Sequence, residues 1–283
     1  MVKSSELSFE GLVAENVPRR LRSVGLGRVV DLMPHILNGT DPKTGERVDI
    51  GREPIDGKQL MAERVYGPHE KDKARMKDNY VVIADSFIGD PSGSGEVLFV
   101  RYHADNTVHD LVRSLHPASN LVSGSLPLAE DPSRASDMYS TIKSRGGVLV
   151  FPPDVAQALR NDIYSMPNAR REFWERMADG DLKLERDYEA MVQKKTGRPF
   201  ERIMGVYPAG VKGLRPVWVG SVGGDYSDAS GDDPRNDNNA RLVGVAPEAQ
   251  AQKIVPATLE DRLPNLSGRT IEIEGVQYIL QKK

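Results

Sequence analysis

Three of the five histidines fall within fourteen residues, and they are the side chains best suited to acid–base or metal chemistry. They are His103, His109 and His116, with Asp105 and Asp110 beside them. Because His109 and His116 are seven residues apart, a continuous helix would place them on the same side. A metal-binding or basic imidazole is usually oriented by a carboxylate. The set therefore suits a metal-dependent hydrolase that uses His103, His109 and Asp110.

Structural roles are the competing interpretation for these side chains, and the one we favour. His103 ends a strand-like run, and His116 falls at an expected helix terminus, where a cationic side chain interacts favourably with the helix dipole. Carboxylates are frequent in ERMADGDLKLERDYEAM, but their spacing from Lys and Arg is typical of a solvated helix face. These carboxylates are Glu175, Asp179, Asp181, Glu185 and Asp187. We therefore expect no catalytic residue, no metal and no cofactor.

A long polar stretch late in the chain offers chemistry of another kind. WVGSVGGDYSDASGDDPRNDNNARLVGV, residues 218–245, suits a flexible linker, a calcium loop or a binding surface. Asp228, Ser230 and Asp232 alternate as early calcium ligands do, but the required glycine is displaced and no glutamate follows at the twelfth position. Two aromatic residues and the strand-like ending RLVGV tie both ends to a core, which argues against a linker. We therefore expect a long, anchored surface loop.

Residue usage within this loop is restricted. Residues 221–239 contain no Lys, Glu, Gln, Met or Trp, although Lys and Glu are common elsewhere in the chain. Small polar side chains around a tyrosine make an adaptable hydrogen-bonding surface at low entropic cost, whereas any long loop also favours Gly, Asp, Asn and Ser for their turn conformations. If the loop is a binding surface, replacing Asp225, Tyr226, Asp228 and Asn238 together with Ala or Ser should change the free energy of unfolding by no more than roughly 1 kcal/mol.

Strands and helices must position these side chains. Strand-like runs cover residues 80–89, 95–103 and 146–151, the first two joined by the loop DPSGSG. Helical spacing follows Thr107 and Asp154, each expected as an N-cap, and the second of these helices is expected to carry Val155, Leu159 and Ile163. Further helical patterns hold Phe173, Trp174 and Met177, then Leu184, Tyr188 and Val192 after a turn at Gly180. This irregular alternation predicts an α+β fold.

The two ends of the chain differ from the middle in their residue patterns. Residues 1–75 are expected to form an irregular, partly helical segment, because prolines and glycines interrupt the helical spacing. GRTIEIEGVQYILQ alternates apolar and polar residues around Glu274 and Gly275, which predicts a β-hairpin. A lone hairpin is marginal in water, so it must pack on the main domain or on a second subunit of a homo-oligomer. We divide the chain at residues 1–75, 76–250 and 251–283.

Whole-chain composition bounds the class of protein. The 283 residues are 39% hydrophobic and 28% charged, which is typical of a folded soluble protein. A formal charge of -3 gives no excess of positive charge that would attract nucleic acid or an anionic membrane. The absence of cysteine removes disulfides, thiolate zinc sites and Cys nucleophiles. No secretory signal or membrane-spanning run is visible, so a cytoplasmic or virion-associated location is expected.

The segment GLRPVWVGSVGGDYSDASGDDPRNDNNARLVGV, residues 213–245, resembles the closing part of the C-type-lectin-like fold in its formylglycine-generating-enzyme branch. A Trp-Gly-Ser-type strand, a long Asn-rich loop and a GFR- or GVR-like final strand recur there. Within that branch the segment is similar to variable proteins of diversity-generating retroelements. Their adenine-directed mutagenesis turns codons such as AAC into several small or polar types, but never into Lys, Glu, Gln, Met or Trp. Residues 221–239 obey this restriction.

This resemblance implies a C-type-lectin-like domain and a role for each residue of the loop. Trp218, Gly220 and Arg241 would be scaffold. The exposed ligand-binding face would comprise Ser221, Gly223, Asp225, Tyr226, Asp228, Ser230, Asp232, Asn236, Asn238 and Asn239. We therefore expect a non-enzymatic protein that binds a protein or carbohydrate partner. The alternatives are a virion or other assembly component, with the hairpin serving subunit contacts, and thirdly the hydrolase described above.

Overall fold

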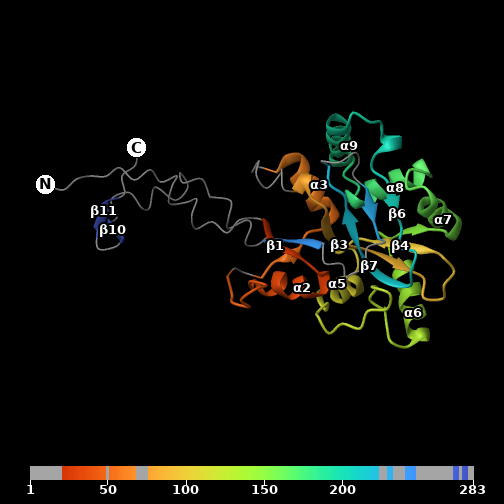
Figure 1. The fold of residues 1–283 in the computed structure, drawn as a ribbon, viewed down its shortest axis with the longest axis horizontal. Helices are drawn as coiled ribbons and strands as arrows, with labels where there is room; N and C mark the ends of the chain where they lie inside the picture. The colour runs from red at the N-terminus through yellow and green to blue at the C-terminus, as the bar shows by residue number, and fades with distance from the viewer. Residues whose placement is uncertain are drawn as a thin grey trace. The chain divides into compact units, whose positions relative to one another are not determined.

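The computed structural model describes residues 21–48, 51–67, 76–222, 228–231, 240–246, 270–273 and 276–279. The chain forms two compact units, one of Leu21–Val245 and the other of Met1–Arg20 with Ala246–Lys283. The Leu21–Val245 unit holds a mixed sheet with helices on both of its faces (Figure 1).

The middle of the sheet is β3 (Val81–Gly89), which confirms the first strand expected from the sequence. All of β3 is buried, as its mainly apolar run predicts. It pairs antiparallel with β4 (Val97–Val100) and β7 (Gly213–Val219), and parallel with β9 (Ala240–Val245). The other strands described in this sheet are β1 (Leu21–Gly27), β2 (Glu53–Pro54), β5 (Leu149–Phe151), β6 (Val206–Tyr207) and β8 (Ala229–Ser230).

The sheet separates two hydrophobic cores, because alternate residues of β3 point to opposite faces. Val81, Ile83 and Phe87 belong to one core, while Val82 and Ile88 belong to the other. Helices α3, α8 and α9 cover the first face, and α2, α5 and α6 cover the second (Figure 1). The helix bounds are α2 Val29–Asn38, α3 Gly57–Tyr66, α5 Asn106–Arg113, α6 Pro132–Lys143, α7 Pro153–Asn161, α8 Pro167–Met177 and α9 Leu182–Thr196.

Two helix starts differ from those expected. The N-cap of α5 is Asp105 rather than Thr107, because the Asp105 carboxylate accepts hydrogen bonds from the backbone N–H groups of Thr107 and Val108. Helix α7 begins with Pro153 as its first residue, so Asp154 lies in the first turn and does not cap it. The same helix ends at Asn161, before Ile163, which was expected to belong to it.

The described part of residues 1–75 joins the main sheet. Strand β1 pairs antiparallel with β9 from Leu21 opposite Val245 to Gly27 opposite Ala240, and β2 extends the same edge. Helix α3 packs on α9. The segment therefore holds two strands as well as helices, and it lies within the Leu21–Val245 unit. The domain boundaries expected at residues 75 and 250 stay predictions.

The second unit contains the hairpin that the alternating pattern predicted. Strands β10 (Thr270–Ile273) and β11 (Val276–Ile279) pair antiparallel, with Ile273 opposite Val276. The two residues between them, where the turn was expected, lie outside the described residues. Among the described helices of the chain, none is long and apolar enough to cross a membrane.

Candidate binding surface

The polar stretch leaves the sheet directly after β7, next to the central strand. Trp218 lies near the end of β7 opposite Val82 of β3, and it is only 4% exposed. The returning strand β9 is also buried at Leu242, Val243 and Val245. Both flanks of the loop are therefore part of the hydrophobic core, as the sequence predicted.

The stretch is interrupted by a short strand, where the sequence suggested one continuous loop. Strand β8 pairs antiparallel with β7, with Trp218 opposite Ser230, and parallel with β6, with Tyr207 opposite Ser230. Ala229 is fully buried. The return of β8 to the sheet leaves two separate segments, residues 223–227 and 232–239, which lie outside the described residues. We call these the display segments.

A buried arginine fixes the chain before the first display segment. Arg64 of α3 is fully buried and donates hydrogen bonds to the Gly220 carbonyl at 2.9 Å and to the Tyr188 hydroxyl at 2.6 Å. The Gly220 N–H in turn donates to the Asp228 carbonyl at 2.7 Å, and the Val222 N–H to the Lys77 carbonyl at 2.6 Å. The start of the segment is thus tied to helix α3 and to the residues before β3.

A carboxylate fixes the chain between the two display segments. Asp228 Oδ1 accepts hydrogen bonds from the Gly205 N–H at 2.9 Å and from the Tyr164 hydroxyl at 3.3 Å. Burial raises the pKa of Asp228 to about 6, although both hydrogen bonds favour the ionised form and act against this rise. Asp228 was expected on the exposed face. Its side chain instead contacts Gly205 and Tyr164, because the β8 return brings it against them.

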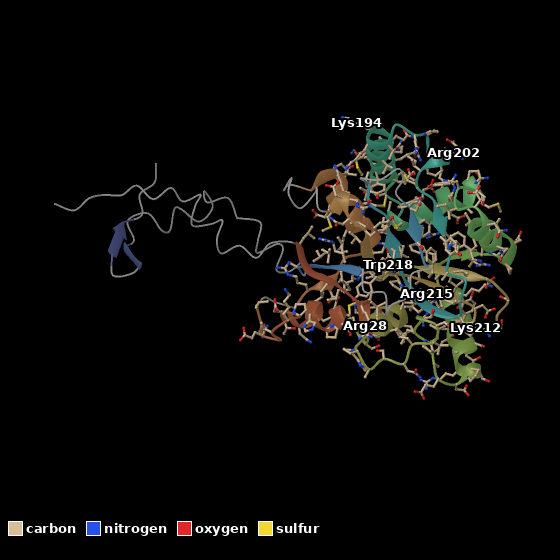
Figure 2. The ribbon with its side chains drawn as sticks, in the orientation of Figure 1. Arg28, Lys194, Arg202, Lys212, Arg215 and Trp218 are labelled. Atoms are coloured by element: carbon tan, nitrogen blue, oxygen red, sulfur yellow. The ribbon has the colours of Figure 1, made fainter. Side chains whose placement is uncertain are left out.

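A second buried arginine fixes the chain before the second display segment. Arg215 of β7 donates to the Ser125 hydroxyl at 2.8 Å, to the Ser123 carbonyl, and at the longer distance of 3.5 Å to the Gly231 carbonyl. The Gly231 N–H donates to the Tyr207 carbonyl at 2.8 Å. A side chain at residue 231 would meet Phe87 at 2.5 Å, so only glycine fits there. Figure 2 labels Arg215 and Trp218.

The residues Gly220, Val222 and Asp228–Gly231, with the side chains that hold them, form what we call the anchor set. The buried guanidinium groups of this set donate to the backbone carbonyls of Gly220 and Gly231, and these hydrogen bonds hold the backbone at the base of the loop. The sequence carried a weak signal for these arginines. Arg64 is the lone cation in LMAERVY, where it follows Glu63, and Arg215 is the lone charged residue in the apolar window GLRPVWV. Their partners, 156 and 16 residues away, were not visible.

The remaining expected site residues divide into two groups. Ser221 is half-buried beside buried Val222, and Ser230 is half-buried in β8. Arg241 is half-buried in β9 opposite Leu26, and Gly220 is buried. Those outside the described residues are Gly223, Asp225, Tyr226, Asp232, Asn236, Asn238 and Asn239. Ligand contact by any of these residues stays a prediction.

The histidine group is not assembled as a continuous helix would assemble it. Helix α5 ends at Arg113, so His116 lies in the following turn, where its Nδ1 accepts from the Ala118 N–H. His103 and His109 do come near each other, with ring centroids 6.1 Å apart, and both pack on Tyr102. Among the described residues no three His, Asp or Glu side chains are grouped so that they could hold a metal ion.

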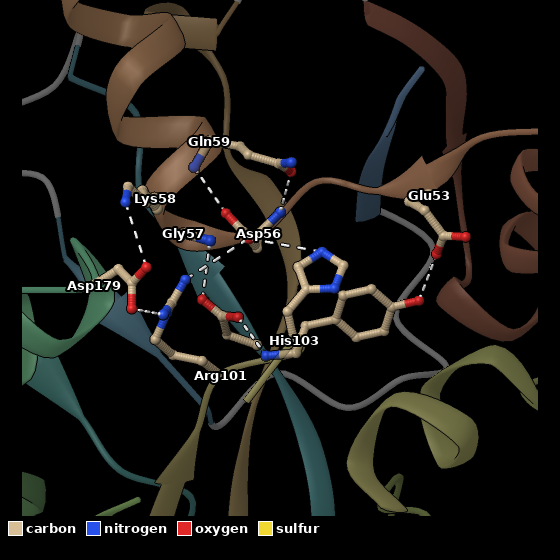
Figure 3. A network of polar contacts seen from close by, with 10 residues as sticks. Glu53, Asp56, Gly57, Lys58, Gln59, Arg101, His103 and Asp179 are labelled. Carbon is tan, nitrogen blue, oxygen red and sulfur yellow. Dashed lines mark hydrogen bonds and ion pairs between the residues drawn. The ribbon is translucent and has the colours of Figure 1, made fainter. Parts of the chain in front are cut away.

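A polar network beside His103 involves residues that sequence analysis did not single out (Figure 3). His103 Nε2 lies 3.9 Å from the carboxylate of Asp56, which caps α3. Asp85 is fully buried and accepts hydrogen bonds from the backbone N–H groups of Gly57 at 2.9 Å and Tyr102 at 2.8 Å. Burial and the nearby Asp56 raise the pKa of Asp85 to about 7. Because all of these contacts join α3 to β3 and β4, the network fastens the scaffold.

The carboxylates of the α8–α9 region are only partly the solvated face that was expected. Asp187 on α9 pairs with Lys183 on the surface. Asp179 pairs with Arg101 and Lys58, which ties the turn between the two helices to β4 and α3. Glu185 is buried, and its carboxylate accepts from Arg171 at 3.0 Å. That pair, which links α8 to α9, was not expected.

Comparison with known proteins identifies the fold. No protein-family model matches the sequence, and no curated protein matches it. A solved structure from Nanoarchaeota, in which the C-type lectin fold accommodates massive sequence variation, is similar to this chain with a TM-score of 0.50 and 13% sequence identity. The similarity covers 81% of this chain and 100% of the other. The chain therefore has the mixed α and β C-type lectin fold that the resemblance implied, and at this identity the match shows the fold alone.

The contacts of Asp228 with Gly205 and Tyr164 change the stability effect expected at this residue, which the sequence placed among side chains whose joint replacement costs no more than roughly 1 kcal/mol. Asp228→Ala should lower the free energy of unfolding by about 1 to 3 kcal/mol, because the Gly205 N–H loses its acceptor in a partly buried position. Asp110→Ala is the matched control, since the Asp110 side chain is 82% exposed and its loss should cost less than about 0.5 kcal/mol. Denaturant unfolding measures both. Equal, small effects would show that Asp228 does not anchor the loop.

Proposed function

We propose that this chain is a non-enzymatic binding protein that recognises a protein or carbohydrate partner through the two display segments. The observation that carries the proposal is the anchor set. Both display segments start from backbone that buried side chains hold, at Gly220 through Arg64 and at Gly231 through Arg215. A recognition surface whose side chains differ freely needs such a base, because the fold must not depend on the side chains that contact the partner.

The residue types of the display segments support the same proposal. Residues 223–227 and 232–239 are Gly, Ser, Asp, Asn, Tyr, Pro and Arg only. Asp, Asn and Ser side chains offer hydrogen-bonding groups in several directions, and a tyrosine supplies contact area at low entropic cost. Hydroxyl-rich carbohydrates and polar protein surfaces are the ligands that such groups recognise.

We further propose that the display segments are diversified, as in the variable proteins that the sequence resembles. The solved structure from Nanoarchaeota supports this, since there the same fold accommodates massive sequence variation. The genetic signature would be a near-copy of the codons for residues 218–245 close to a reverse transcriptase gene. The two copies should differ at codons of the display segments and agree at the buried positions Val222, Ala229 and Gly231.

The histidine group supports a hydrolase less well. His109 contacts the adjacent Asp110, whose side chain is largely exposed, and His103 contacts the capping residue Asp56 at 3.9 Å. An Asp–His pair of this kind needs a nucleophile or a metal within reach of the imidazole before it can do hydrolytic chemistry. Among the described hydrogen bonds of His103 and His109, none involves a Ser, Thr or Lys side chain.

Tyr226 is the aromatic residue of the display segments, so it is the expected centre of binding energy. Tyr226→Ala should weaken the affinity for the partner by about 2 kcal/mol, or roughly 30-fold, with the melting temperature little altered. Titration calorimetry against a partner selected from protein and glycan panels measures the effect. Tyr66→Ala, at a 49% exposed tyrosine of α3, is the matched control and should leave the affinity unchanged. Equal affinities of the Tyr226→Ala and Tyr66→Ala variants for the partner would show that Tyr226 does not contribute to binding.

A further inference from the structure

A pocket of about 430 Å³ lies on the Leu21–Val245 unit, and none of the three histidines lines it. Its lining comes from the glycine-rich turn between β3 and β4, from residues 209–212 before β7, from Val122 and Ser123, and from Arg160 of α7. The volume falls in the range of sites for small organic molecules and is larger than a lone inorganic ion requires. Every residue of this lining belongs to the described part of the chain.

Glycines in the lining make room for two cationic side chains. A Cβ added to Gly93 would lie 3.2 Å from Lys212 Cε and 3.4 Å from its Nζ. A Cβ added to Gly210 would lie 3.4 Å from Arg160 Cδ. Both long side chains therefore pack against bare backbone. Gly93 also has a φ of +84°, a conformation that disfavours any larger residue.

The acidic residues of the pocket are already engaged within the protein. Asp90 accepts hydrogen bonds from the Ser92 N–H at 2.9 Å and the Ser92 hydroxyl at 2.5 Å. Partial burial acts to raise the pKa of Asp90, but hydrogen bonds from Ser92 and Ser94 outweigh it and hold this pKa below its usual range. Both oxygens of Glu96 accept from Lys143, at 2.7 and 2.8 Å, and one also accepts from Tyr139. Glu96 is therefore paired with a cation outside the pocket lining, and the hydrogen-bonding capacity of Asp90 is used by neutral groups of Ser92.

The two cationic residues of the pocket, Arg160 and Lys212, are not paired with carboxylates of the described residues. Arg160 donates to the neutral Gln157 side chain at 3.1 Å, which uses one of its five N–H donors. Among the described residues, no carboxylate lies within 4.0 Å of Arg160 or Lys212. An ammonium and a guanidinium that line one concave site without acidic partners attract an oxyanion.

We propose that this pocket binds a small organic anion, whose carboxylate or phosphate group is held by Lys212 and Arg160. The pocket adjoins the anchor set, since its lining residue Ala209 would be 3.0 Å from a Cβ at Gly231, and Ser123 accepts from Arg215. The site contains no residue of the display segments. It is therefore a second binding site, which lies near Gly231 and is built from described residues. The test of this site is independent of the test of the proposed function.

Titration calorimetry or NMR titration of the full chain tests this site with three probes that share a hexose ring, glucuronate, glucose 6-phosphate and glucose. We expect the anionic probes to bind and neutral glucose not to bind. Tighter binding of glucuronate, against the larger charge of the phosphate ester, identifies the group as a carboxylate, and tighter binding of glucose 6-phosphate at pH 5, where both probes carry about one negative charge, identifies it as a phosphate. Raising the salt concentration should weaken the binding, because it depends on charge.

Variants locate the binding. Lys212→Met with Arg160→Met should weaken binding of the anionic probes at least about tenfold, since two charge-assisted contacts are lost. Lys194→Met with Arg202→Met is the matched control, because both residues are exposed cations outside the pocket lining; Figure 2 labels them with Lys212. The control pair should change binding less than about twofold. Failure of both anions to bind, equal binding of glucose, or equal loss in the two pairs would overturn the assignment.

Discussion

Replacing Trp218 with alanine should lower the free energy of unfolding by about 3 to 5 kcal/mol. The indole is 4% exposed and belongs to the second hydrophobic core, and Trp218 pairs in the sheet with Val82 of β3 and Ser230 of β8, so its loss leaves a cavity where the loop joins the sheet. Denaturant unfolding followed by circular dichroism measures the change. Because the cavity lies at the base of the display segments, binding should weaken in this variant as well.

Trp218→Phe separates packing from hydrogen bonding at the same position. The buried Trp218 Nε1 has no hydrogen-bond partner among the described residues, so phenylalanine removes an unsatisfied donor while keeping most of the apolar volume. Its cost should stay below about 2 kcal/mol. A Trp218→Ala cost no larger than that of Trp218→Phe would show that the indole fills no space in the core, contrary to its position in the structure.

The stability of the protein should fall as the pH rises from about 4 to about 7 through the ionisation of Asp85. The pKa of Asp85 is raised to about 7 in the folded state by burial and by Asp56, against about 3.9 in an unfolded chain. The folded state therefore keeps a proton that the unfolded state loses in this window. The contribution of Asp85 is fully present below pH 4 and is lost as the pH passes 7, at up to about 1.4 kcal/mol per pH unit.

Asp85→Asn isolates this contribution, because other buried carboxyls such as Asp228 add to the same slope. The amide is also expected to cost about 1 to 3 kcal/mol at every pH, since it cannot accept from both the Gly57 and Tyr102 N–H groups. The informative quantity is the difference in slope between wild type and variant from pH 4 to 7. Parallel stability curves would mean that Asp85 stays ionised, held by Arg101 and the two N–H donors.

Local patterns in the sequence predicted the elements whose signals lie within a few residues. The apolar run at 80–89 is β3, the apolar residues around Trp174 and Tyr188 are helical, and the alternating tail is a hairpin. The burial of Trp218 was expected from its place as a large aromatic residue at the start of the polar stretch. These features depend on periodicity and on side-chain volume, which a single sequence displays directly.

The base of the candidate site depends on contacts between distant residues, so it could not be predicted. Strand β8 forms because β6 and β7 offer backbone partners on both sides, although its two residues carry no strand pattern of their own. Asp228 faces inward because the Gly205 N–H lies beside it. Arg64 reaches Gly220 across 156 residues. A polar loop composition says which residue types are present, but it does not say which of them the fold holds.

The central claim is that residues 223–227 and 232–239 carry recognition while the anchor set carries the fold. The most direct measurement replaces both display segments with Gly-Ser sequences of equal length, keeps Asp228–Gly231, and compares the affinity for the partner of the wild type together with the melting temperature. We predict that the swapped protein melts within a few degrees of wild type and no longer binds the partner. A folded swap that binds the same partner with unchanged affinity would contradict the claim and place recognition elsewhere on the molecule.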